Sequence, residues 1–317
     1  MRKPKTAEIR AKEERAIAAG VERALAAWRA LRRAVLLGTP AEGDANKSVD
    51  AYAQRKLEEQ QWRTSEKVAY TNELIGTAAI VAVGCSASAI GIIAPSMAFG
   101  LMVALCISCA PRGAPKHYNP AVTFAFACAG ITPWKSVVPY VLCQFIGAMV
   151  GATVAYGIAA FTAAPTAGAC VSAALSFRAM FATEALLTAT LVNAIFTLEA
   201  TVSRFLGAVP FALCVGAAVT AICSSSWANL SGGGLNPARA IAPPVVARVF
   251  RTSPLDQGKD GALRQAEAHA SSQDAVAYAF APLVGSGVAA ALWAGAIGVP
   301  NPSTAHRNQA GKKQESK

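Results

Sequence analysis

Two short segments that begin with Asn-Pro-Ala constrain the fold of this chain most strongly. Each follows a stretch rich in glycine or proline and opens a short apolar run. Asparagine is favoured at a helix N-cap because its side-chain oxygen accepts a backbone N–H, and proline is favoured at the next position because its missing N–H has no helical partner there. Each run is shorter than the about 20 residues that cross a bilayer. The sequence therefore predicts two short helices, which begin at Asn119-Pro120-Ala121 and Asn236-Pro237-Ala238.

Charge is unevenly distributed along the 317 residues. Hydrophobic residues make up 54% of the chain and charged residues only 15%, well below the roughly 25% of a soluble domain. Most charged side chains lie in residues 1–68 and in the tail, which indicates a membrane body with a polar N-terminal arm. The net charge is +11, but basic and acidic residues are interleaved in the arm, so we expect no nucleic-acid partner. We expect no cleavable signal peptide, because the arm lacks the necessary apolar core.

Hydropathy predicts an all-α membrane protein with six transmembrane helices and two re-entrant half-helices. The chain divides into an arm of residues 1–68, a membrane domain of 69–298 and a tail of 299–317. Residues 1–37 have helical periodicity, which suits either a helix on a membrane surface or a solvated arm. The predicted spans are 69–93, 95–110, 134–161, 177–198, 205–224 and 275–298, and the half-helices are 119–129 and 236–247.

The membrane domain contains two similar halves, about 69–163 and 177–298. Glu73 in the first span matches Glu184 in the fourth, since each precedes an Asn-Pro-Ala segment by a similar distance. Because each copy has an odd number of spans, three, the second copy must insert into the membrane in the opposite orientation. The half-helices then enter from opposite faces and meet at their N-termini near the midplane. The distribution of basic loops predicts that both termini are cytoplasmic, in the plasma membrane or an intracellular vacuole.

Only three charged side chains lie deep in the apolar segments. Such groups are costly and mark function by default. Glu73 and Glu184 could each accept backbone N–H groups of the re-entrant loop in its own half, and we favour this bracing role over a proton relay because the spans contain no histidine. Arg239 follows the second Asn-Pro-Ala segment directly. No nearby acid in that loop suggests a salt bridge, so we expect Arg239 to face a pore and to repel cations.

These residues resemble the major intrinsic protein family, the aquaporins and glycerol channels, over roughly residues 69–298. The resemblance implies an aquaporin-like channel domain that forms a homotetramer in membrane lipid, with one pore in each subunit. It also implies that the amides of Asn119 and Asn236 point into the pore, beyond their plain role as N-caps. A selectivity filter would then comprise Phe99, Ser224, Gly233 and Arg239, with Cys223 in place of Ser224 if the register slips by one.

The filter departs from both subfamilies. Water-selective members usually have histidine where Ser224 stands, and glycerol channels have aspartate where Ala240 follows Arg239. Small residues at positions 224 and 233 predict a ring wider than a water filter. We therefore expect passage of water and small neutral solutes such as glycerol, ammonia or hydrogen peroxide, with exclusion of protons and ions.

Two other functions remain as alternatives. A secondary transporter can also have broken helices and inverted repeats, and a structural junction protein could use the same scaffold with a closed pore. We expect no enzyme, no catalytic residue and no cofactor, because the sequence has no nucleophile–base pair. We expect no metal site either. Cys106 and Cys109 have the only metal-like spacing, and we interpret them as small core residues rather than a redox or zinc pair.

Overall fold

The computed structural model describes residues 66–90, 93–162, 168, 170, 175–203, 206–250 and 272–297. Up to Trp293 these residues belong to one compact unit, Arg55–Trp293. The predicted arm, apart from its last residues, and the predicted tail lie outside the described residues, as does the polar loop 251–271. The division into arm, channel domain and tail, and the cytoplasmic position of both termini, therefore stay predictions.

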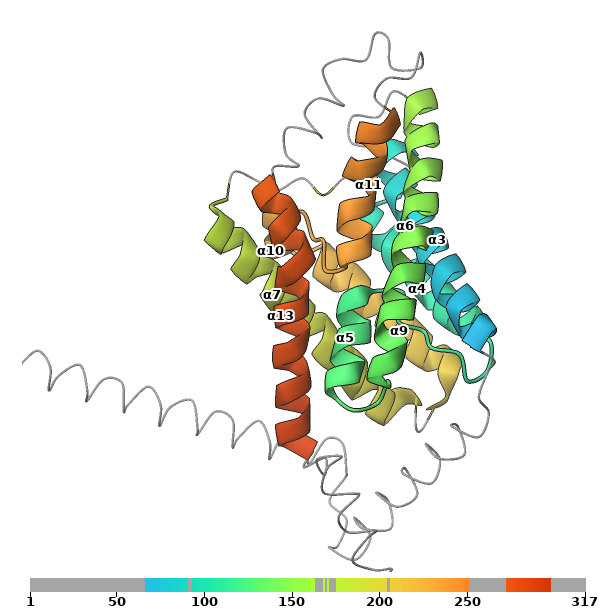
Figure 1. Cartoon of the computed structure of the whole chain (residues 1–317), viewed down its shortest axis with the longest axis vertical. Coiled ribbons are helices and arrows are strands. Elements are labelled where there is room, and N and C mark those ends of the chain that lie inside the picture. The colour runs from blue at the N-terminus through green and yellow to red at the C-terminus, as the bar shows by residue number, and fades with distance from the viewer. Residues whose placement is uncertain are drawn as a thin grey trace, which may run out of the picture. The chain divides into compact units, whose positions relative to one another are not determined.

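The described residues form helices and connecting loops, with no strand among them (Figure 1). The first half comprises α3, α4, the short α5 and α6, and the second comprises α7, α9, two short helices α10 and α11, and α13. Their bounds are Glu66–Ile90 (α3), Pro95–Cys109 (α4), Pro120–Cys128 (α5), Trp134–Thr162 (α6), Phe177–Leu198 (α7), Ala208–Cys223 (α9), Ser226–Ser231 (α10), Pro237–Phe250 (α11) and Ser272–Ile297 (α13). The predicted helical membrane fold is confirmed.

Four of the helices, α3, α6, α7 and α13, are long and apolar enough to cross a membrane. The other two predicted spans are shorter helices. The α4 helix has 15 residues, one fewer than the predicted 95–110, and α9 has 16, four fewer than the predicted 205–224, which corresponds to about 22–24 Å of helix. Local sequence explains their ends. Pro95 begins α4 and Pro111 follows its end, and Gly207 precedes α9 with a φ of 90° that most side chains do not tolerate.

Two local features differ from the prediction. After Leu198 the chain continues as a π-helical turn, Glu199–Ser203, rather than ending its helix there. In the second re-entrant loop, α10 forms one additional short helix. The Ser225 side chain accepts a hydrogen bond from the N–H of Ala228, and Gly232 ends α10 in the left-handed conformation. Serine at the N-cap and glycine after the last turn are the usual signals of such a helix.

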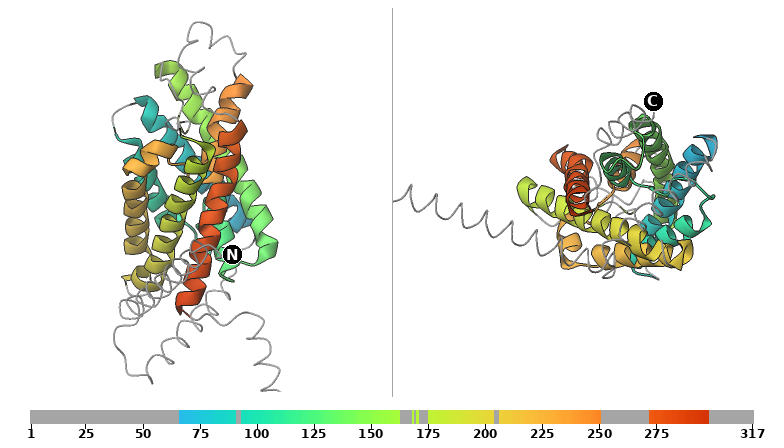
Figure 2. Two further views of the ribbon diagram at one scale, coloured as in Figure 1. Left: turned by 90° about the vertical axis from the view of Figure 1, so that its left-hand side faces the viewer. Right: turned by 90° about the horizontal axis from the view of Figure 1, so that it is seen from below.

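Close helix packing depends on glycines at the crossing points. A Cβ atom on Gly147 of α6 would lie 2.2 Å from the Leu74 carbonyl oxygen of α3, and one on Gly285 of α13 would lie 2.0 Å from the Ala185 carbonyl oxygen of α7. These two pairs are the first and last helices of each half, and α13 runs beside α7 in Figure 2. Small residues allow backbones to approach this closely, which is how helices associate in lipid.

The middle helices of the two halves, α4 and α9, pack against each other in the same way. A Cβ atom on Gly100 would lie 2.4 Å from the Gly216 carbonyl oxygen, and one on Gly216 would lie 2.4 Å from the Gly100 carbonyl oxygen. The contact is thus reciprocal. The short helices α5 and α11 begin near one another and run apart, α5 downward and α11 upward in Figure 1. The two halves are therefore related as inverted copies.

Candidate pore

The two Asn-Pro-Ala segments begin helices α5 and α11. Each helix starts at the proline that follows the asparagine. The side-chain oxygen of Asn119 accepts a hydrogen bond from the N–H of Ala121 at 2.9 Å, and that of Asn236 accepts one from Ala238 at 3.0 Å. Both asparagines thus satisfy a backbone N–H that a helix start leaves without an intrahelical partner.

The side-chain amides of the two asparagines connect the two loops. Asn119 Nδ2 donates to the carbonyl oxygen of Leu235 at 3.0 Å, and Asn236 Nδ2 donates to that of Tyr118 at 2.8 Å. Tyr118 and Leu235 have positive φ values of 50° and 51°, a conformation that is costly for side chains of this size. The strained residue in each loop is therefore fixed by the asparagine of the other loop.

Glu73 of α3 braces the first loop. Its Oε1 accepts a hydrogen bond from the N–H of His117 at 2.8 Å, and its Oε2 accepts one from Tyr118 at 2.7 Å. Gln144 Nε2 also donates to Glu73 Oε2 at 2.7 Å and to the Thr123 hydroxyl at 2.8 Å. Glu73 is fully buried. Its carboxylate therefore accepts the hydrogen bonds that water would accept from these backbone N–H groups at an exposed site.

Glu184 of α7 makes the equivalent contacts in the second loop. Its Oε1 accepts a hydrogen bond from the N–H of Gly234 at 2.9 Å, and its Oε2 accepts one from Leu235 at 2.8 Å. The hydroxyl of Ser231 donates to Oε1 at 2.7 Å, and the Tyr278 hydroxyl donates to the Ser231 carbonyl oxygen. Like Glu73, Glu184 is fully buried. Both predicted bracing residues therefore lie against the loops of their own halves.

Arg239 lies in the first turn of α11, beside Phe99 of α4. The guanidinium carbon is 4.7 Å from the centre of the Phe99 ring, which is within the range of a cation–π contact. The guanidinium group also contacts the sulfur of Cys170. Gly233, with a φ of 59°, lines the same opening as Arg239 and Phe99. The structure thus places Arg239 against Phe99, and it places Gly233 in the wall of the same opening.

Two neighbouring residues are candidates for the fourth predicted filter position. Cys223 ends α9 and Ser224 caps it, and both line the opening. The Ser224 hydroxyl is 2.8 Å from that of Ser96, and this hydrogen bond ties it to the start of α4. Both predicted alternatives for this position, Ser224 and Cys223, therefore remain.

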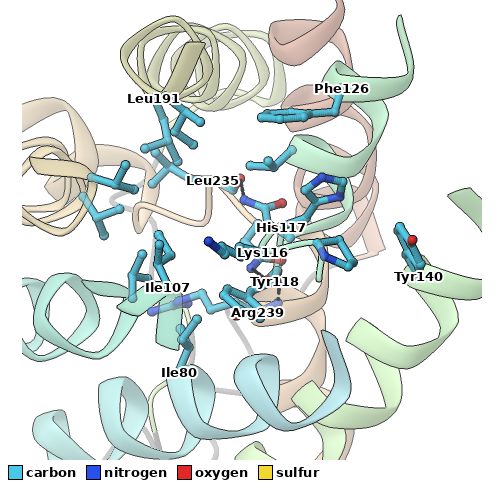
Figure 3. A pocket seen from close by; sticks show the side chains of 18 of the residues that line it. Ile80, Ile107, Lys116, His117, Tyr118, Phe126, Tyr140, Leu191, Leu235 and Arg239 are labelled. Atoms are coloured by element: carbon cyan, nitrogen blue, oxygen red, sulfur yellow. Dashed lines mark hydrogen bonds between the residues drawn. The ribbon is translucent and has the colours of Figure 1, made fainter. Parts of the chain in front are cut away.

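One opening connects these features from one side of the asparagine pair to the other. Its wall carries the two asparagines, the predicted filter residues and a row of aliphatic side chains. Figure 3 labels Arg239 and the aliphatic side chains of Ile80, Ile107 and Leu191 among them. Several charged residues also line it, away from Arg239 in sequence. The aliphatic side chains include Ile80, Ile107, Val122, Leu191, Ile195 and Val215, and the other charged residues are Glu66, Arg112, Lys116, Lys135 and Glu199.

Sequence reasoning missed several residues that shape this opening. Gln144 is buried beneath the first loop, and Ser231 and Tyr278 hold the second through Glu184. No local motif marks them, because each contact joins residues far apart in the chain. Cys170 falls in the loop between the halves, where the sequence suggests only a linker. Lys116 lies three residues before Asn119, and this position beside the first Asn-Pro-Ala segment could have identified it as a residue that lines the opening.

The cysteines of the described segments form no metal site. All eight are free thiols, including Cys106 and Cys109. Among the described residues there is no group of three or more His, Cys, Asp or Glu side chains that could hold a metal ion.

Comparison with known proteins gives one family. The family model described as Major intrinsic protein matches residues 62–293. The chain is 33% identical over 196 residues to Aquaporin NIP2-2 of Zea mays, which covers 56% of this chain and 62% of that protein. It is 46% identical over 61 residues to the Glycerol uptake facilitator protein of Streptococcus pneumoniae, covering 19% of this chain and 26% of that protein.

The fold is also similar to a solved structure, the aquaglyceroporin from Plasmodium falciparum. The TM-score is 0.59 at 20% sequence identity, and the match covers 72% of this chain and 96% of that chain. At this identity the likeness bears on the fold alone. The chain spans about three fifths of the length of the maize relative. The sequence comparisons therefore show the family of the membrane domain, and they do not show the activity of the whole protein.

Proposed function

Because the chain belongs to the major intrinsic protein family, we propose that it is a passive transmembrane channel for water and small neutral solutes. The observation that carries this proposal is the asparagine pair at the centre of the opening. Each amide has two N–H donors, and one donor holds the opposite loop. The other donor is then available to the oxygen of a passing molecule.

The proposed channel excludes protons and other ions. Helices α5 and α11 both point their N-termini at the asparagine pair, where the macrodipoles place partial positive charge. A water molecule that accepts bonds from both asparagines turns its hydrogens away along the pore, which interrupts a proton wire. Arg239 adds a fixed positive charge on the α11 side. Together these groups oppose the entry of cations.

The proposed filter suits solutes with one polar and one apolar side. Arg239 supplies donors, whereas Phe99 and the aliphatic wall supply apolar surface. Gly233 adds no side chain, and either Ser224 or Cys223 fills less volume than histidine would. We therefore propose that glycerol, ammonia or hydrogen peroxide passes as well as water. The names of the maize and bacterial relatives, an aquaporin and a glycerol uptake facilitator, are compatible with this range.

The two alternative functions have less support. A secondary transporter needs an acid at depth that can bind a coupling ion, yet Glu73 and Glu184 are fully buried and already accept three hydrogen bonds each from the loops and their neighbours. A closed-pore junction protein needs an occluded filter, whereas Gly233, Ser224 and Cys223 all border the opening.

The setting of the channel is part of the same proposal. Large apolar side chains are exposed along the outer faces of the helices, for example Leu142, Ile146 and Val150 on α6, and would contact membrane lipid or neighbouring subunits. We propose a homotetramer with one pore in each subunit, with both termini on the cytoplasmic side of a plasma or vacuolar membrane. Catalysis is not part of the proposed function.

The test is a swelling assay on reconstituted vesicles. Purified full-length protein is incorporated into liposomes, and light scattering follows volume changes under impermeant-osmolyte, glycerol and urea gradients. The proposal expects water flux above protein-free vesicles, with the weak temperature dependence of a pore, and measurable glycerol flux. Saturable uptake that requires an ion gradient would favour the transporter, and water flux equal to protein-free vesicles would favour the closed-pore protein.

A further inference from the structure

The bracing bonds of the two glutamates establish which residues of the two loops are equivalent. Glu73 holds the N–H groups of His117 and Tyr118, and Glu184 holds those of Gly234 and Leu235. Tyr118 and Leu235 also share the same positive φ and the same bond from the opposite asparagine. The residue before each pair is therefore equivalent too, so Lys116 is the counterpart of Gly233.

The same register applies beyond the asparagines. Arg239 is the third residue after Asn236, and its counterpart three residues after Asn119 is Val122. On the α11 side, the residue three positions before the asparagine is Gly233 and the residue three positions after it is the cation Arg239. On the α5 side, the residue three positions before the asparagine is the cation Lys116 and the residue three positions after it is aliphatic. At these two equivalent positions, each half thus has one positive side chain, and the position that carries it is exchanged between the halves.

Lys116 lies in the wall of the opening. It is half-buried, and Figure 3 labels it among the side chains that line the opening. The backbone that follows it is fixed, because Glu73 binds the next two N–H groups. Within the part of the chain that the structure describes, its ammonium group forms no ion pair or hydrogen bond. The charge is therefore not neutralised by a carboxylate in contact.

We propose that Lys116 is a second charge filter, on the opposite side of the asparagine pair from Arg239, and that the two residues share the exclusion of cations. This inference rests on the proposed channel function. A cation that enters from the α11 side passes Arg239 before it reaches the asparagine pair, and one that enters from the α5 side passes Lys116 before it reaches the pair. Between them the N-termini of α5 and α11 add further positive potential. A cation therefore meets positive charge along the whole central part of the pore.

Lys116 also occupies space that its counterpart leaves open. Gly233 has no side chain, whereas the lysine side chain extends by four methylene groups and ends in three N–H donors. Polar solutes could accept hydrogen bonds from this ammonium group as they pass. Because the group is flexible and strongly hydrated, we expect it to screen charge without stopping neutral molecules.

The experiment compares four variants of the full-length protein in proteoliposomes. Lys116→Met removes the positive charge at nearly constant side-chain length, and Lys116→Arg retains the charge. Arg239→Val and the double variant Lys116→Met with Arg239→Val complete a double-mutant cycle with Lys116→Met. The matched control is Lys67→Met, since Lys67 is exposed on α3 and lies outside the lining of the opening. Each preparation is assayed for water flux and for the decay of imposed Na⁺ and H⁺ gradients.

The expected result is a Na⁺ leak for Lys116→Met that exceeds wild type by roughly fivefold, the order expected when a unit charge close to a solvated ion path is removed. Lys116→Arg and Lys67→Met should match wild type, and the double variant should leak more than either single variant. An unchanged leak for Lys116→Met in both backgrounds, with normal water flux in wild type, would overturn the role of Lys116 alone. Absent water flux in wild type would instead overturn the channel function, and this inference with it.

Discussion

Asn119 and Asn236 hold each other's loops in place: each donates its amide N–H to the carbonyl of the residue that precedes the other, at 3.0 Å and 2.8 Å. The bonds are reciprocal and join segments more than 100 residues apart. They connect α5 and α11 into one unit although neither short helix crosses the membrane. The centre of the opening is therefore determined by contacts between the two halves, and each half alone would lack its partner's donor.

The first prediction tests the bracing role of the buried glutamates. We expect Glu73→Gln and Glu184→Gln each to destabilise the protein by about 2–4 kcal/mol, because a buried carboxylate that accepts backbone N–H bonds is replaced by an amide with one acceptor fewer. Thermal unfolding in detergent, followed by the loss of the monodisperse elution peak, measures the change. The control is Glu66→Gln, since Glu66 is exposed. A glutamate variant that conducts fewer protons than wild type but is equally stable would support a proton relay instead.

The second prediction concerns the crossing of α4 and α9. A Cβ atom on Gly100 would lie 2.0 Å from the Thr220 hydroxyl and 2.4 Å from the Gly216 carbonyl oxygen, so Gly100→Ala forces the helices apart. We expect a loss of stability of about 1–3 kcal/mol, as for other overpacked sites. Gly157→Ala on α6 is the matched control, because a Cβ atom there meets nothing within 4 Å, and alanine is favoured over glycine in a helix by up to about 1 kcal/mol. Equal melting temperatures for the two variants would contradict this account.

The helices and the half-helix starts could be predicted from the sequence because their signals are local. Asparagine followed by proline specifies a helix start within a few residues, and long apolar runs specify the long helices. The matched positions of Glu73 and Glu184 could be recognised because the sequence repeats. The α10 helix was missed although Ser225 and Gly232 are ordinary capping signals, because apolar periodicity is too weak over six residues.

The remainder of the pore depends on contacts between distant segments. Gln144 is a single polar residue in a long apolar helix, and nothing nearby shows that it reaches Glu73 across 71 positions. Cys170 meets Arg239 across 69 positions. The choice between Cys223 and Ser224 depends on where α9 ends, which is uncertain by a residue or more from sequence alone. Long-range geometry of this kind has no local signal.

The third prediction concerns ion exclusion at Arg239. We expect Arg239→Val to increase the decay rate of an imposed pH gradient while water still passes, because the substitution removes the fixed charge beside Phe99 and leaves an apolar side chain. The increase should be several-fold and not complete, since the N-termini of α5 and α11 still oppose protons. A pH-sensitive dye enclosed in the vesicles measures the decay. Arg178→Val, at an exposed site on α7, is the control, and an unchanged decay for Arg239→Val would contradict its role in the pore.

The fourth prediction decides which residue completes the filter and how wide the filter is. Gly233 is a poor site for this test, because its φ of 59° disfavours a side chain and a Cβ atom would lie 3.2 Å from that of Ala228. Substitution at the end of α9 avoids that strain. Cys223→His and Ser224→His place the same imidazole one residue apart, so each variant is the matched control of the other.

Histidine at the true filter position should face Arg239, reduce the diameter and add a second polar donor. Because selectivity depends on pore diameter and lining donors, we expect that variant to reduce glycerol flux by roughly tenfold, a change of about 1.4 kcal/mol in the barrier, while water flux falls far less. The other variant should leave the ratio of glycerol to water flux near that of wild type. Stopped-flow light scattering under parallel glycerol and sucrose gradients gives both fluxes from one preparation. If neither histidine changes the ratio, the filter is not bordered by the end of α9, and if wild-type vesicles show no glycerol flux above protein-free vesicles, the channel is a water pore.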